Sequence, residues 1–69
     1  MKTLVEAIAI TQHEVTMYNN KQAKILLGEL SSMYRAVGDK SISFVHNQLT
    51  NEEYATLVLC RNNLYNQGA

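Results

Sequence analysis

Few residues of this sequence have the types and spacing that catalysis or metal binding requires. His13 and His46 are far apart, and neither belongs to an H-x3-H or H-E-x-x-H pattern, so no zinc site is predicted. Cys60 flanks an apolar stripe, where a small buried thiol is more usual than a nucleophile paired with histidine. Glu52 and Glu53 occupy the first turn of a predicted helix, where capping and the helix dipole account for both. We therefore expect no catalytic residue, no metal and no cofactor, and a protein that is not an enzyme.

A second set of polar residues could read DNA. Residues 30–49, LSSMYRAVGDKSISFVHNQL, have the outline of a helix-turn-helix: a helix, a glycine at the turn and a short polar helix. That second helix would present side chains able to hydrogen-bond base edges, namely Ser43, His46, Asn47 and Gln48. Its stretch ISFVHNQ resembles the recognition helix of the lac-type repressor family, with a turn after Gly38 that is two residues shorter. A small helix-turn-helix-like transcriptional regulator is therefore the alternative prediction.

The charge balance argues against that alternative. Six basic residues match six acidic ones, so the sequence offers no basic surplus for contacts to a phosphate backbone. Binding to nucleic acid is accordingly not the main expectation.

Capping signals and apolar spacing predict three main helices. Thr3 and Thr50 each precede a glutamate by three residues, which is the spacing of a capping box. Asn20 can cap the second helix, and Gly38 follows its last apolar residue, where a C-cap favours glycine. The helices are expected over residues 3–18, 20–37 and 50–66.

The connector between the last two helices leaves two readings open. Asp39 could cap a short helix that carries Ile42 and Val45, or residues 41–44 could be extended. The helical reading is favoured. The predicted fold is all-α: a small three-helix bundle of one domain, residues 1–69. Its first two helices form an antiparallel hairpin, the C-terminal helix packs across it, and the connector is short and helical.

Several aliphatic residues lie off the predicted apolar stripes. At 100° per residue, these side chains point away from the core on three different helices: Ile10, Met17, Ile25 and Leu59. Single exposed aliphatics are ordinary, but four on a weakly charged chain predict a second buried surface. We expect these four residues to form an interface with a second copy or with another protein.

Composition sets the broad class. The chain has 69 residues, no net charge, 46% hydrophobic residues and one cysteine. A single cysteine indicates a reducing compartment, and no apolar stretch reaches the length of a membrane span, so a cytoplasmic location without membrane association is expected. The Asn-rich composition favours a phage or mobile-element origin. We therefore predict a small non-enzymatic interaction or regulatory protein, homo-oligomeric, acting as an inhibitor or adaptor of another protein.

Overall fold

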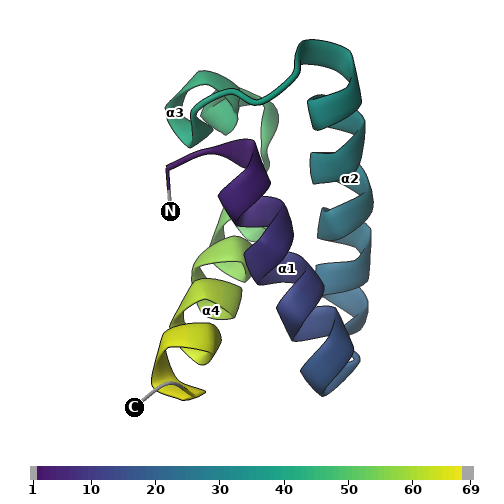
Figure 1. Cartoon of the computed structure of the whole chain (residues 1–69), viewed down its shortest axis with the longest axis vertical. Helices are drawn as coiled ribbons and strands as arrows, with labels where there is room; N and C mark the ends of the chain where they lie inside the picture. Colours follow the sequence, from purple (N-terminus) through teal and green to yellow (C-terminus); the bar gives the residue numbers. More distant parts are fainter. Residues whose placement is uncertain (1, 68–69) are drawn as a thin grey trace.

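The computed structural model describes residues 2–67, which form an all-α arrangement (Figure 1). The helices are α1 (Leu4–Tyr18), α2 (Lys21–Val37), α3 (Ile42–Val45) and α4 (Asn51–Gln67), with a 3-10 turn, η1 (His46–Gln48), after α3. The three predicted main helices are confirmed, and each begins one residue later than expected. The connector is the short helix that the sequence favours.

The predicted capping residues fix the helix ends. Thr3 Oγ1 accepts a hydrogen bond from the Glu6 amide at 3.3 Å. Asn20 Oδ1 accepts from the amides two and three residues later, at 2.9 and 3.3 Å. Gly38 ends α2 with a φ of +77°, which residues with a Cβ rarely adopt. Because these contacts are local in sequence, the helix boundaries follow from the sequence directly.

The start of α4 is the most complete of these caps. The Thr50 amide donates to Glu53 Oε1 at 2.9 Å, and the Glu53 amide donates to Thr50 Oγ1 at 3.1 Å. This reciprocal pair satisfies two amides that the helix itself leaves without acceptors.

Replacing Thr50 by alanine is therefore expected to lower the free energy of unfolding by about 1 kcal/mol. The melting temperature should fall by about 4–8 °C in a chain of this size. Thermal unfolding followed by circular dichroism measures the change. Thr16→Ala is the matched control, because Thr16 is a solvent-exposed residue within α1 that does not cap the helix. Alanine is the better helix former at such a position. If the two variants melt alike, the capping box does not stabilise α4.

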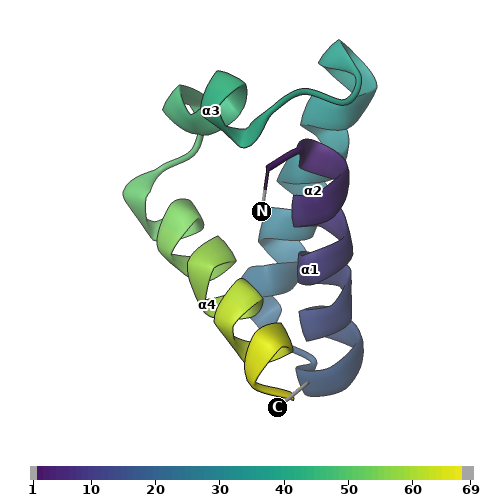
Figure 2. The ribbon, with the colours of Figure 1, turned by 60° about the vertical axis from the view of Figure 1, so that its left-hand side comes forward.

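α1 is the central helix of the fold. It forms an antiparallel hairpin with α2, and α4 packs against its other side (Figure 1). α2 and α4 contact each other less than either contacts α1. Figure 2 shows α4 inclined to the hairpin, with α3 spanning the space between the ends of α2 and α4.

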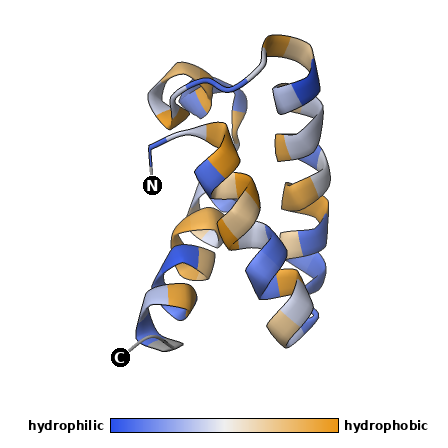
Figure 3. Cartoon of the chain, viewed as in Figure 1, coloured by the Kyte–Doolittle hydropathy of each residue, from blue (hydrophilic) through white to orange (hydrophobic). Residues whose placement is uncertain are grey.

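The core consists of two clusters. The larger one gathers buried residues from α1, α2, the connector and α4, namely Leu4, Ala7, Leu26, Leu30, Ile42, Val45, Leu49 and Leu57. The smaller one lies further along α1 and contains Ile10, Ala23 and Cys60. Figure 3 shows strongly hydrophobic residues along both α1 and α2. The α3 turn contributes Ile42 and Val45 to the larger cluster, and it thereby covers one end of the bundle.

The connector also holds the start of α1. The Leu4 amide donates to the Lys40 carbonyl at 2.9 Å, and the Ile42 amide donates to the Lys2 carbonyl at 2.8 Å. Asp39 does not cap α3: its Oδ1 accepts from the Val5 amide of α1 at 3.2 Å, while Ser41 caps α3. Asp39 is drawn to α1 because the connector crosses beside the free amides of the first turn of that helix.

Candidate functional site

A concave surface lies between α2 and α4. This α2–α4 groove has a volume of about 590 Å³ and is lined by Gln22, Ile25, Leu26, Thr50, Glu52, Glu53, Ala55, Thr56 and Leu59. Leu26 is fully buried at its floor, whereas Ile25 and Leu59 keep 65% and 50% of their surface exposed on its walls. The groove therefore offers aliphatic surface to a binding partner.

The packing of α2 and α4 on α1 creates this groove. α2 turns Ala23, Leu26 and Leu30 toward the core, and Ile25 lies about 100° around the helix from Leu26. On α4, Leu59 likewise lies about 100° around the helix from the buried Cys60. Since α2 and α4 each contact α1 more than they contact each other, these flanking aliphatics remain exposed.

Carboxylates occupy the rim of the groove. Interaction with Glu53 of α4, by hydrogen bonding and secondly by its negative charge, raises the pKa of Glu29 on α2. The backbone amide of Thr50, followed by the Glu29 contact, lowers the pKa of Glu53. Glu53 is therefore the more acidic of the two carboxyls.

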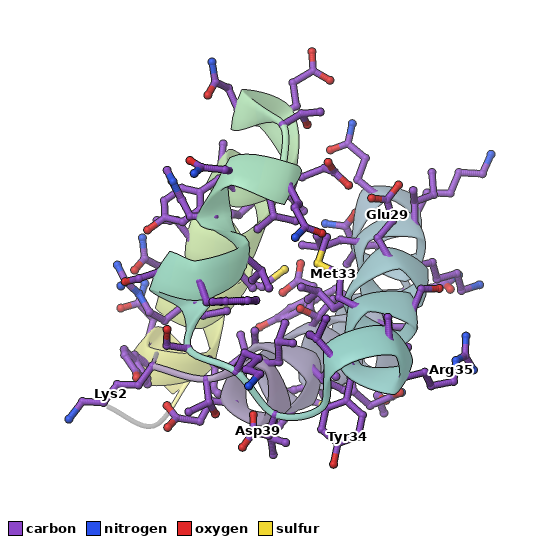
Figure 4. The ribbon with its side chains drawn as sticks, turned by 90° about the horizontal axis from the view of Figure 1, so that it is seen from above. Lys2, Glu29, Met33, Tyr34, Arg35 and Asp39 are labelled. Atoms are coloured by element: carbon purple, nitrogen blue, oxygen red, sulfur yellow. The ribbon has the colours of Figure 1, made fainter. Side chains whose placement is uncertain are left out.

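Figure 4 shows how three side chains of α2 lie. Met33 points from α2 into the interior, Glu29 lies one turn away, and Arg35 points away from the bundle. A smaller groove between α1 and α2 is lined by Val5, Ile8, Ser31, Tyr34 and Arg35. Its lining includes the positively charged Arg35, whereas the lining of the α2–α4 groove includes the carboxylates of Glu52 and Glu53.

The structure brings together two of the four aliphatics that the sequence assigns to an interface. Ile25 and Leu59 line the same groove. Met17 is 55% exposed near the end of α1 but is not among the residues that line the groove. The expected exposure of these three residues is confirmed, and their role in an interface stays a prediction.

The expectation that Ile10 lies outside the core is wrong. Ile10 is only 6% exposed and packs with Ala23 and Cys60. The prediction assumed one apolar stripe on each helix, whereas α1 contacts α2 on one side and α4 on the other. The buried arc of a central helix is wider than that of an edge helix, and it includes Ile10.

The four residues of the DNA-binding alternative lie together at the connector. Ser43 belongs to α3, and His46, Asn47 and Gln48 form η1; all four are exposed. The His46 ring packs edge-on against Tyr54, with ring centroids 4.6 Å apart. A four-residue helix followed by a 3-10 turn is shorter than the recognition helix that a helix-turn-helix places in the major groove.

Sequence reasoning missed a buried carboxylate. Glu14 of α1 is 2% exposed. Asn63 of α4 donates to its two oxygens at 3.1 and 3.4 Å, and Asn20, the cap of α2, donates to Oε2 at 3.1 Å. One acidic side chain therefore joins all three long helices. Its position three residues after the buried Thr11 is the sequence signal that could have indicated this role.

Cys60 is buried beside this network. Burial, and secondly the negative charge of Glu14, raise the pKa of the Cys60 thiol from 9.0 to about 11. Because the thiolate is the reactive form, this environment suppresses nucleophilic chemistry. The raised pKa means that the thiol supports the fold below pH 9, and that this contribution is lost as the pH rises from about 9 to about 11.

Iodoacetamide should therefore label Cys60 about 100-fold more slowly in the folded protein than in urea at pH 8.5, because a pKa raised by about two leaves that much less thiolate. Mass spectrometry measures the rate as a single adduct, since the chain has one cysteine. Equal rates in buffer and in urea would show that the thiol is accessible and ionisable in the native protein.

Two further findings concern residues 2–67. Within them no group of three or more His, Cys, Asp or Glu side chains could hold a metal ion. No helix in this range is long and apolar enough to cross a membrane. The α2–α4 groove is thus the candidate site with the clearest geometry.

Comparison with known proteins adds nothing to this geometry. No protein-family model, curated protein or solved structure matches the chain.

Proposed function

We propose that this chain is a small non-enzymatic interaction protein that acts as an inhibitor or adaptor of another protein through the α2–α4 groove. One observation carries the proposal: Ile25 and Leu59, from two different helices, are 65% and 50% exposed on the walls of one groove. Burying an aliphatic side chain fully contributes about 1.5–3 kcal/mol, so two such anchors on a concave surface favour binding.

The accessible surface area supports a chain that folds before it binds its partner. The accessible surface is 4454 Å², and a compact monomer of this mass exposes about 4,400 Å². The bundle is therefore as compact as a free-standing domain, which suits an adaptor that folds first and binds afterwards. Self-association stays a prediction of the sequence, and the mass of a crosslinked adduct distinguishes it from binding to another protein.

Photo-crosslinking tests the proposal even when the partner is unidentified. Leu59 is replaced by the photo-crosslinker p-benzoylphenylalanine, and the variant is expressed in the organism whose genome encodes the protein. After irradiation, the crosslinked adducts are separated by mass. Tyr65 is the matched control position, because it lies on the same helix, is 59% exposed and does not line the groove.

A discrete adduct from position 59 that is absent from position 65 is the expected result. An adduct of twice the mass of the chain would identify a second copy as the partner. No adduct from position 59, or the same adducts from both positions, would overturn the proposal that the groove is a protein-docking site.

A further inference from the structure

The acidic residues of the chain are concentrated at the groove. Of its six acidic residues, Glu52 and Glu53 line the groove, and Glu29 of α2 interacts with Glu53; these three are called the rim carboxylates. The residues that line the groove include no lysine or arginine. A chain without net charge therefore presents a locally negative surface around an aliphatic floor.

The carboxylates and the aliphatics are separated along the groove. α2 and α4 run in opposite directions, so the start of α4 lies beside the middle of α2 (Figure 1). Glu53, in the first turn of α4, accordingly meets Glu29. Leu59 lies about two turns after Glu53 on α4, and Ile25 lies one turn before Glu29 on α2. Because the two helices are antiparallel, Leu59 and Ile25 lie toward the same end of the groove. One end of the groove is thus acidic and the other aliphatic.

The dimensions of the groove suit one helix of a partner. From Thr50 to Leu59, α4 advances by about 14 Å, since each helical residue rises 1.5 Å. An amphipathic helix that docks with anchors at i, i+3 or i+4 and i+7 spans about 10 Å between the first and last anchor. Two to three turns of a partner helix therefore match the length of the groove.

We infer that the α2–α4 groove binds a cationic amphipathic helix of another protein. Its apolar side chains would contact Ile25 and Leu59, and its lysine or arginine side chains would contact Glu29, Glu52 and Glu53. The inference rests on the proposed docking function and adds the chemistry of the partner. A cation placed beside Glu29 and Glu53 would compensate the negative charge of both carboxylates.

A second copy of this chain fits the groove less well. When a two-fold axis passes through the groove, the acidic end of each copy meets the aliphatic end of the other, and the lining offers no lysine or arginine to pair with the carboxylates. Burying a carboxylate without a cationic partner weakens association. The charge distribution therefore favours a different, basic partner.

Two synthetic helices test the inference on the full chain. Both have about 15 residues, with leucines at i, i+3, i+4 and i+7. One carries lysines at the flanking positions, and the other carries glutamates there. We expect the lysine peptide to bind at least about tenfold more tightly at low salt, because three rim carboxylates each add a modest attraction. Rising salt should reduce this preference.

Variants of the protein connect binding to the groove. Leu59→Asn should weaken binding of the lysine peptide about tenfold, whereas Met17→Asn, at a similarly exposed helical position outside the groove, should not change it. Glu29→Gln with Glu53→Gln should reduce the preference between the two peptides. Thermal melting verifies that each variant is folded.

The outcomes separate the two proposals. Equal affinity of the unmodified protein for both peptides, or an undiminished preference in the double glutamine variant, would overturn the cationic-helix inference. If position 59 crosslinks to a partner while the peptides show no preference, docking stands and the partner chemistry is wrong. If position 59 gives no adduct, the docking function itself fails.

Discussion

Replacing Asn63 by aspartate is expected to destabilise the protein by about 3 kcal/mol, because it puts a second carboxylate against the buried Glu14. The substitution removes the amide that donates to both Glu14 oxygens at 3.1 and 3.4 Å. It leaves Glu14, which is 2% exposed, with Asn20 as its remaining donor among those described. The melting temperature should fall by about 15 °C, at 4–8 °C for each kcal/mol in a chain of this size.

Asn62→Asp is the matched control for this prediction. Asn62 is the exposed neighbour of Asn63 on α4, and the same substitution there adds the same charge at the surface. It should change the free energy of unfolding by less than about 0.5 kcal/mol. Urea denaturation followed by circular dichroism measures both variants. Equal stability of the two would mean that the Glu14 network does not hold the helices together.

The second large effect is expected at Ile10. Ile10→Ala should cost about 2–4 kcal/mol, because it opens a cavity in the cluster with Ala23 and Cys60. Ile25→Ala, the same substitution at a side chain that is 65% exposed, should cost less than about 0.5 kcal/mol. Urea denaturation gives both values directly. An Ile10 variant as stable as the Ile25 variant would show that Ile10 lies outside the core.

Local chemistry explains how much of the fold could be predicted. Thr3, Asn20, Gly38 and Thr50 each act on amides or carbonyls within a few residues, so their positions in the sequence determine where helices begin and end. The one misplaced cap, Asp39, bonds to an amide 34 positions away, and such a contact exists only once the chain has folded.

The candidate site required tertiary information. The sequence indicates that Ile25 and Leu59 leave their apolar stripes, but it does not show that α1 holds α2 and α4 so that both side chains line one groove. The prediction for Ile10 is wrong for the same reason, because its burial depends on α1 packing against both α2 and α4. The Glu14 contact with Asn63 spans 49 positions, and no local pattern encodes that pairing.

The central claim is that the α2–α4 groove is the protein-docking surface, and a heteronuclear NMR titration of the isotope-labelled chain with the lysine peptide tests it most directly. We predict that the amide signals that shift most belong to the lining residues Gln22, Ile25, Thr56 and Leu59. Signals of the α1–α2 groove, at Val5 and Tyr34, should stay in place. Shifts centred on Val5 and Tyr34 or on the connector, with none at Ile25 and Leu59, would contradict the claim.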